Sequence, residues 1–119
     1  MPDGEIRYLQ IPAADLDASA GFCETVFGWG TRTNTNDERA FDDASGQVSG
    51  TWVLGRSLAS EPGVLVWVKV DSVEATLKTI TNAGGEVVLP MTPQGEGEAI
   101  ATFRDPACNV LGIFHEKPR

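Results

Sequence analysis

An internal repeat is the feature that most constrains how this chain folds. Residues 41–52 and 103–114 match each other at a constant offset of 62, and each segment has the pattern of a tight turn followed by a strand. The matched pairs are Phe41 with Phe103, Asp43 with Asp105, Val48 with Val110 and Gly50 with Gly112, with an aromatic residue at both Trp52 and Phe114. The second half of the chain is therefore expected to copy the fold of the first.

Each half also predicts the same order of elements. A helix is expected after Asp15 and after Asp71, because aspartate is a favourable N-cap and an apolar stripe at helical spacing follows each of them. Strands are expected at residues 5–11, 30–36, 38–42, 47–54, 64–70, 86–89, 99–104 and 109–115, with a Gly-rich loop at 93–97. The order βαβββ, repeated, predicts an α+β fold. We expect one domain over residues 1–119, built from modules at about 1–55 and 64–119.

The chain is acidic. Its 119 residues include 9 Lys plus Arg and 17 Asp plus Glu, so the formal net charge is 9 − 17 = −8. Such a charge repels phosphate backbones and anionic lipids, which argues against nucleic-acid and membrane partners. It favours cationic small molecules, although a surface charge that only keeps the protein in solution is the alternative.

The cysteines and the first residues bear on the cellular compartment. Cys23 and Cys108 lie far apart and have neither a metal-binding spacing nor a disulfide pattern, so reduced thiols are expected. The sequence does not start with a basic segment and an apolar core, and no apolar run approaches about 18 residues. We therefore expect a cytoplasmic protein.

Three motifs resemble a known family. They are Ile11-Pro-Ala-Ala-Asp-Leu-Asp, then Phe22 followed by Val26-Phe-Gly-Trp29, and Phe103-Arg-Asp-Pro-Ala-Cys-Asn-Val-Leu-Gly112. Together they resemble the vicinal oxygen chelate superfamily, which includes glyoxalase I, extradiol dioxygenases and the bleomycin-resistance proteins. The likeness covers essentially the whole chain. It implies two βαβββ modules that form a curved, mixed sheet enclosing a cleft, commonly within a homodimer.

The resemblance also indicates where a metal ion would be held. In metal-using members, the first and last strands of each module supply His, Gln or Glu ligands, and the matching positions here are Ile6, Gly50, Leu65 and Gly112. None of these side chains can bind a metal, so we expect neither a metal nor another cofactor. His115 is the only histidine, and its parity is opposite to that of Gly112, so it should point away from the cleft. No nucleophile and base can be combined, and no catalytic residue is predicted.

Strand alternation predicts the rest of the cleft. A step of two residues from each of the four ligand positions reaches an aromatic residue, one on each strand. Polar groups continue this face on two of the strands, and the two glycines deepen its floor. The predicted ligand-binding residues are Tyr8, Gln10, Gly50, Trp52, Trp67, Lys69, Gly112 and Phe114. Packing of these aromatic residues against each other or against a partner chain is the alternative.

These observations favour a metal-independent binding protein of the glyoxalase/bleomycin-resistance type over an enzyme. Its ligand would be a planar aromatic or cationic small molecule, sequestered as in drug or metabolite resistance. One alternative is a metal-dependent lyase, isomerase or dioxygenase whose ligands are concealed by a register error of one residue. Another is a regulatory or scaffold dimer module in which side chains fill the cleft.

Overall fold

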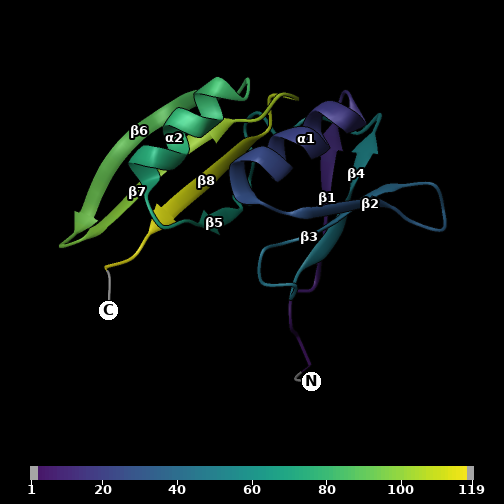
Figure 1. The fold of residues 1–119 in the computed structure, drawn as a ribbon, viewed down its shortest axis with the longest axis horizontal. Helices are drawn as coiled ribbons and strands as arrows, with labels where there is room; N and C mark the ends of the chain where they lie inside the picture. Colours follow the sequence, from purple (N-terminus) through teal and green to yellow (C-terminus); the bar gives the residue numbers. More distant parts are fainter. Residues whose placement is uncertain (1–2, 118–119) are drawn as a thin grey trace. The chain divides into compact units, whose positions relative to one another are not determined.

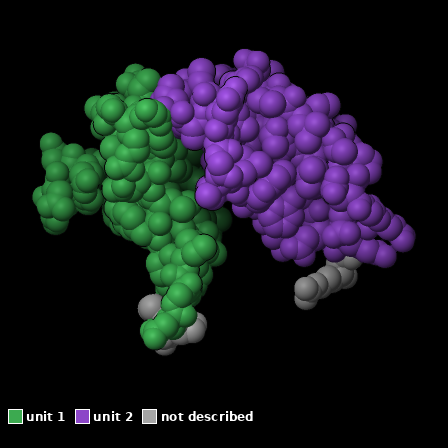
Figure 2. Space-filling view, turned by 180° about the vertical axis from the view of Figure 1, so that it is seen from behind, with its two compact units in different colours: residues 1–57 green, residues 58–119 purple. Residues whose placement is uncertain are grey.

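The structure is a computed structural model that describes residues 3–117. The chain divides into two compact units, residues 1–57 and 58–119, which Figure 2 shows in different colours. Each unit contains one helix and one four-stranded sheet. The unit boundary falls between the two modules that the repeat predicted.

The first unit begins with a strand and a helix and continues with three strands. Its elements are β1 (Tyr8–Ala13), α1 (Leu16–Phe27), β2 (Gly30–Thr33), β3 (Arg39–Asp42) and β4 (Ser49–Leu54). The strands lie in the order β1-β4-β3-β2, with β1 parallel to β4 and the other neighbours antiparallel. The helix α1 contacts β2, β3 and β4, so it covers one face of this sheet.

The second unit repeats that order. Its elements are β5 (Trp67–Lys69), α2 (Val73–Asn82), β6 (Glu86–Gly95), β7 (Glu98–Arg104) and β8 (Val110–His115). The strands lie in the order β5-β8-β7-β6, with β5 parallel to β8 and the others antiparallel. Figure 1 shows α2 lying across one face of this sheet, where it contacts β6, β7 and β8.

The predicted α+β fold of two βαβββ modules is confirmed, and both sheets are mixed. The prediction of a Gly-rich loop at residues 93–97 is wrong. β6 continues to Gly95, and a two-residue turn at Glu96 and Gly97 leads directly into β7. Gly97 has a φ of 74°, the left-handed conformation that tight hairpin turns require. The pairing of β6 with β7 contains register shifts, so the residues of β6 do not alternate regularly between the two faces. A regular alternation is the sequence signal by which the strand could have been predicted.

Both helices begin at a capping side chain. The carboxylate of Asp15 accepts a hydrogen bond from the N–H of Ala18 at 3.1 Å, as predicted. The second cap is Ser72 and not Asp71: the Ser72 hydroxyl accepts from the N–H of Ala75 at 3.1 Å. Both residue types are favourable caps, so the sequence pattern alone could not separate these neighbours. In the described part of the chain, no helix is long and apolar enough to span a membrane.

Each unit has its own core between helix and sheet. In the first unit Trp29, Phe41 and Trp52 are buried in contact: the ring centroids of Trp29 and Phe41 are 4.7 Å apart, and those of Phe41 and Trp52 are 4.9 Å apart. Fully buried side chains of α2, β7 and β8 form the second core: Val73, Ile80, Ala101, Phe103 and Ile113. Removal of this apolar surface from water is the main force that holds each unit together.

Candidate ligand-binding site

The two repeated turns determine how the sheets correspond. In the first turn the N–H of Asp43 donates to the carbonyl of Val48, and in the second the N–H of Asp105 donates to the carbonyl of Asn109, each at 2.9 Å. Four residues lie between the bonded positions in the first turn and three in the second. The first turn therefore contains one additional residue.

The backbone conformation shows which residue is additional. Gly46 and Cys108 occupy the same place, because their φ angles are 74° and 71°. Their N–H groups also make the same bond, to the carbonyls of Asp43 and Asp105 at 3.0 and 2.9 Å. The extra residue follows Gly46 and is thus Gln47.

The offset between the halves is consequently 62 before this turn and 61 after it. Phe41 pairs with Gly50 across β3 and β4, and Phe103 pairs with Leu111 across β7 and β8, so Gly50 corresponds to Leu111. Because side chains alternate along a strand, a shift of one residue places residues that match by letter on opposite faces of their sheets. The predicted equivalence of Gly50 and Gly112 is wrong for this reason.

Gly50 and Trp52 belong to the core of the first unit. The Phe41 ring lies so closely over Gly50 that a Cβ atom at this position would be 2.5 Å from Phe41 Cζ. Trp52 lies beside the same ring and is only 3% exposed. Thr31 pairs with Phe41 across β2 and β3 and hydrogen-bonds to Glu24 of α1, which identifies this face as the one covered by the helix.

The opposite face of the first sheet is polar. Tyr8 is 54% exposed, and its hydroxyl donates to Oγ1 of Thr51 at 3.5 Å. Gln10 pairs in register with Thr51, and its side-chain oxygen accepts from Arg56 at 2.7 Å. The row of aromatic residues predicted on one face is therefore divided, with Tyr8 on this face and Trp52 on the other.

In the second unit the glycine lies on the face opposite α2. Trp67 pairs with Gly112 across β5 and β8, and its ring covers the glycine: a Cβ atom at Gly112 would be 2.5 Å from Trp67 Cζ3. Trp67 is 41% exposed, whereas Ile113 on the helix-covered face is fully buried. Phe114 lies two residues after Gly112 and projects to the same face as Trp67. We call Trp67 and Phe114 the aromatic wall.

A pocket of about 400 Å³ opens beside the aromatic wall, within the size range of small-molecule sites. Ile100 pairs with Phe114 across β7 and β8, and Glu98 precedes Ile100 by two residues, so both project to the face of the aromatic wall. The residues lining the pocket are Trp67, Gln94, Glu98, Ala99, Ile100, Phe114 and His115. The pocket thus combines an apolar surface with one carboxylate and one amide.

The sequence predicts Trp67 and Phe114 on one face but does not predict the polar lining of the pocket. The predicted loop at residues 93–97 includes Gln94 and ends beside Glu98, so neither residue is expected on a strand face. A signal was nevertheless available: Glu98 and Ile100 alternate with Ala99 and Ala101, which are buried. This period of two indicates a strand with one face in the core and one face uncovered.

His115 has a structural partner on the helix side. Its Nδ1 accepts a hydrogen bond from the N–H of Val73, the first residue of α2, at 2.9 Å. The bond agrees with the prediction that His115 points away from the face of Gly112, although the residue is among those that line the pocket. Nδ1 is therefore committed to the first turn of α2.

Lys69 lies beside the aromatic wall without lining the pocket. It pairs in register with Phe114, and its ammonium group is 3.9 Å from the carboxylate of Glu116. Both side chains are largely exposed, and an exposed pair of this kind contributes less than about 1 kcal/mol. Lys69 therefore sits at the margin of the site, with its charge balanced by a neighbour.

The pKa values of the two turn carboxylates, Asp43 and Asp105, shift in opposite directions. Burial raises the pKa of Asp105, and hydrogen bonds from Asn109 and the N–H of Ala107 offset only part of that effect. Asp43 is also desolvated, but hydrogen bonds from the Ser45 hydroxyl and several backbone N–H groups outweigh this and lower its pKa. Both carboxylates are fully engaged in shaping their turns, which assigns them a structural role.

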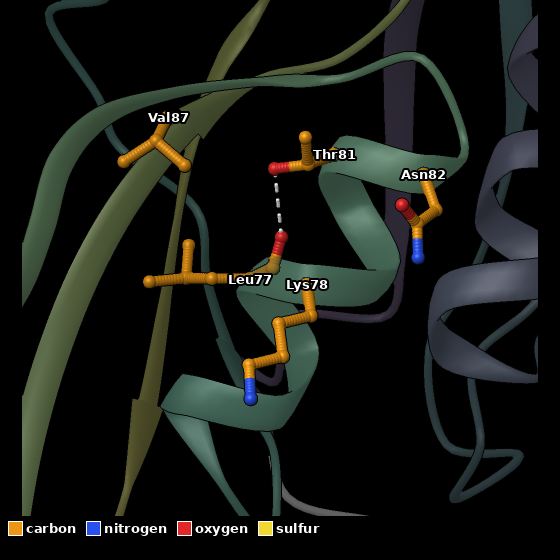
Figure 3. A pocket seen from close by; sticks show the side chains of 5 residues that line it. All are labelled: Leu77, Lys78, Thr81, Asn82 and Val87. Atoms are coloured by element: carbon orange, nitrogen blue, oxygen red, sulfur yellow. Dashed lines mark hydrogen bonds between the residues drawn. The ribbon is translucent and has the colours of Figure 1, made fainter.

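A second pocket, of about 370 Å³, lies between α2 and β6 (Figure 3). Its lining residues are Leu77, Lys78, Thr81, Asn82 and Val87. The Thr81 hydroxyl donates to the carbonyl of Leu77 at 3.0 Å, so it is committed to its own helix. Only two apolar side chains and no aromatic ring line this pocket. The pocket beside the aromatic wall is accordingly the stronger candidate.

The residues at the expected metal positions do not fit a metal ion. Among residues 3–117, no group of three or more His, Cys, Asp or Glu side chains is placed to hold one. The offset of 61 after the turns makes Thr51 the counterpart of Gly112. The helix caps Asp15 and Ser72 are 57 residues apart, and the same offset makes Tyr8 the counterpart of Leu65. Ile6 precedes β1 and is 74% exposed. Hydroxyl and aliphatic side chains at these places are poor ligands for a divalent ion.

A sequence profile of the Glyoxalase/Bleomycin resistance protein/Dioxygenase superfamily matches residues 5–113. The chain belongs to this superfamily. The family predicted from the three sequence motifs is thereby confirmed. No curated protein matches this member of the glyoxalase superfamily significantly.

Solved structures share the glyoxalase-superfamily fold. The fosfomycin resistance protein FosX from Listeria monocytogenes has a TM-score of 0.78 at 18% identity, over 98% of this chain and 96% of that chain. A hypothetical protein from S. aureus has a TM-score of 0.75 at 20% identity, with the same coverage of 98% and 96%. A glyoxalase/bleomycin resistance protein/dioxygenase family enzyme from Burkholderia phytofirmans has a TM-score of 0.75 at 18% identity, over 94% and 98%. At these identities the likeness concerns the fold alone.

Proposed function

We propose that this protein binds a flat aromatic small molecule in the pocket of the second unit, without a metal ion. The observation that carries the proposal is the Trp67 ring, which lies on Gly112 and remains 41% exposed beside Phe114. A large apolar ring that is held in place and left partly uncovered offers a stacking surface. Gln94 and Glu98 at the rim supply the few polar groups that orient a ligand.

The backbone supports this interpretation of Trp67. Gly112 has no side chain, so the indole settles against the strand and one of its faces is fixed by contact with the sheet. The ring is thus ordered before a ligand arrives, and little side-chain entropy is lost on binding. Exposed aromatic residues on flexible segments lack this support.

The proposed role is sequestration of a toxic compound. FosX is described as a fosfomycin resistance protein, and the superfamily includes bleomycin resistance proteins. A binding protein confers resistance by lowering the free concentration of a compound, which needs a pocket and no reacting group. The lining of the pocket contains no pair of nucleophile and base, in keeping with such a role.

Calorimetric titration with quinoline and N-methylquinolinium tests the proposal. Trp67→Ala should weaken binding of either bicycle about tenfold, because stacking and apolar burial on one indole contribute about 1–2 kcal/mol. Met91→Ala is a matched control: Met91 is 43% exposed on β6 and does not line the pocket. Equal affinities for the parent, Trp67→Ala and Met91→Ala would contradict the proposed site.

Metal independence has its own test. The purified protein should contain no stoichiometric transition metal by elemental analysis, and a chelator should leave the affinity for both bicycles unchanged. Stoichiometric Ni, Zn, Fe or Mn, together with loss of binding in the chelator, would favour the metal-dependent enzyme instead.

A further inference from the structure

We propose that Glu98 makes the pocket of the second unit select positively charged aromatic compounds. This inference rests on the proposed function, and it adds the charge of the ligand to its shape. The carboxylate and the aromatic wall lie on one face of one sheet, so a single flat cation can contact both.

The geometry places Glu98 on the face of the aromatic wall. Glu98 and Ile100 are two residues apart on β7, and Ile100 pairs directly with Phe114 on β8. Glu98 also pairs with Gly95 across the hairpin, and a Cβ atom at Gly95 would lie 2.9 Å from Glu98 Oε1. The missing side chain at Gly95 thus leaves space for the carboxylate at the rim of the pocket.

The charge of Glu98 is not paired with another charge in the described part of the chain. Among residues 3–117, no ion pair or side-chain hydrogen bond engages its carboxylate, and Lys69 and Lys117 are paired with other residues. Lys69 is 3.9 Å from Glu116, and Lys117 is 3.7 Å from Glu96. His115, which also lines the pocket, accepts a hydrogen bond at Nδ1 from the N–H of Val73. Glu98 is the one carboxylate that lines the pocket, and it has no positively charged partner among these residues.

Two physical effects then favour a cation. A positive ring stacked on the Trp67 indole gains a cation–π attraction in addition to burial. The same ring approaches the unpaired Glu98 carboxylate, and the formal charge of −8 on the whole chain adds a field of the same sign. An anion of the same shape meets repulsion from each of these sources.

Three probes of one shape separate charge from stacking: N-methylquinolinium, quinoline at a pH where it is neutral, and a quinoline carboxylate. Calorimetry should give the tightest binding for the cation and the weakest for the anion. Glu98→Gln should weaken the cation about fivefold, the contribution of one partly exposed ion pair, and leave neutral quinoline unchanged. Added salt should reduce the preference for the cation.

Glu96→Gln is the matched control, because it removes the same charge only two residues from Glu98. The Glu96 carboxylate is already paired with Lys117. It should leave the preference for the cation within about twofold of the parent. Equal affinity of the parent for cation and neutral probe, or an equal loss in Glu98→Gln and Glu96→Gln, would overturn the role of Glu98 and leave the binding site intact. If Trp67→Ala changes the affinity for none of the probes, the proposed function fails, and the selectivity fails with it.

Discussion

Gly50 in the first unit and Gly112 in the second both lie under an aromatic ring, but on opposite faces of their sheets. Phe41 covers Gly50 in the core, and Trp67 covers Gly112 on the face away from α2. In each case the absence of a side chain lets a ring rest directly on a strand. The same local arrangement therefore stabilises a core in one unit and forms the proposed binding surface in the other.

The difference arises from one residue in a turn. Gln47 lengthens the first turn, so the strand that follows it is out of phase with its counterpart by one position. Because strand faces alternate with a period of two, a single insertion is sufficient to exchange core and surface. Two halves that look alike in sequence can thus diverge in function without any change in fold.

The sharpest expected contrast is between the two tryptophans. Trp52→Ala should lower the free energy of unfolding by about 3–5 kcal/mol, because it empties a large volume in the core. Trp67→Ala should lower it by less than about 1.5 kcal/mol, since much of that ring is already in water. Chemical denaturation followed by circular dichroism measures both. Comparable losses in the two variants would contradict the assignment of faces.

The two glycines should respond in the same order. Gly50→Ala should destabilise the protein by about 3 kcal/mol, because the methyl group would meet both the Leu9 carbonyl and the Phe41 ring, and neither can move aside. Gly112→Ala should destabilise it by about 1 kcal/mol, because the Trp67 ring can swing into solvent. Its larger effect should be on binding of N-methylquinolinium, measured by calorimetry. A stable Gly50→Ala variant would show that the core tolerates the methyl group.

The equivalent turn positions predict changes of opposite sign. Cys108 adopts a left-handed φ of 71°, which costs a non-glycine residue about 1–2 kcal/mol, so Cys108→Gly should stabilise the protein by up to about 1 kcal/mol after the entropy cost of glycine. Gly46→Ala, at the same place in the other turn, should destabilise it by about 1 kcal/mol. Thermal unfolding of both variants provides the comparison. Shifts of the same sign would show that the turns are not equivalent.

The turn carboxylates should give the smallest effects, visible in the pH dependence of unfolding. The lowered pKa of Asp43 stabilises the protein above the ordinary value of 3.8, and this stabilisation is lost as the pH falls through the lower folded-state value. The raised pKa of Asp105 acts in the opposite sense: stability decreases as the pH rises from 3.8 to the folded-state value. Asp43→Asn should therefore flatten the acid limb by less than about 1 kcal/mol. Asp105→Asn should remove the decrease in stability that occurs as the pH rises above 3.8. Profiles of stability against pH that are identical in the parent and both variants would contradict these directions.

Much of the fold follows from the sequence because apolar periodicity and caps are local signals. The stripe from Val73 to Ile80 and the cap at Asp15 needed no knowledge of tertiary contacts. The choice of Ser72 over Asp71 did need them, because two adjacent residues are chemically able to cap the same helix. Local patterns fix which elements form more firmly than where they begin.

The candidate site was harder to predict because it depends on register. The two halves have identical residues at Val48 and Val110 and at Gly50 and Gly112, which favours an alignment without a gap. The hydrogen bonds of the turns show that the first turn contains an extra residue. The polar rim was missed for a related reason: Gly95 and Gly97 suggested a loop, whereas they form a tight hairpin that brings Glu98 beside the aromatic wall. Pairing between strands is not encoded in any single segment.

The central claim is that Trp67, and not Trp52, faces the ligand. The chain contains three tryptophans, so a nitrogen–proton correlation spectrum should show three indole N–H resonances, which Trp67→Phe assigns by the loss of one of them. Titration with N-methylquinolinium should shift the Trp67 resonance progressively and leave those of Trp29 and Trp52 in place. A shift confined to Trp52, with the Trp67 resonance unmoved, would contradict the account.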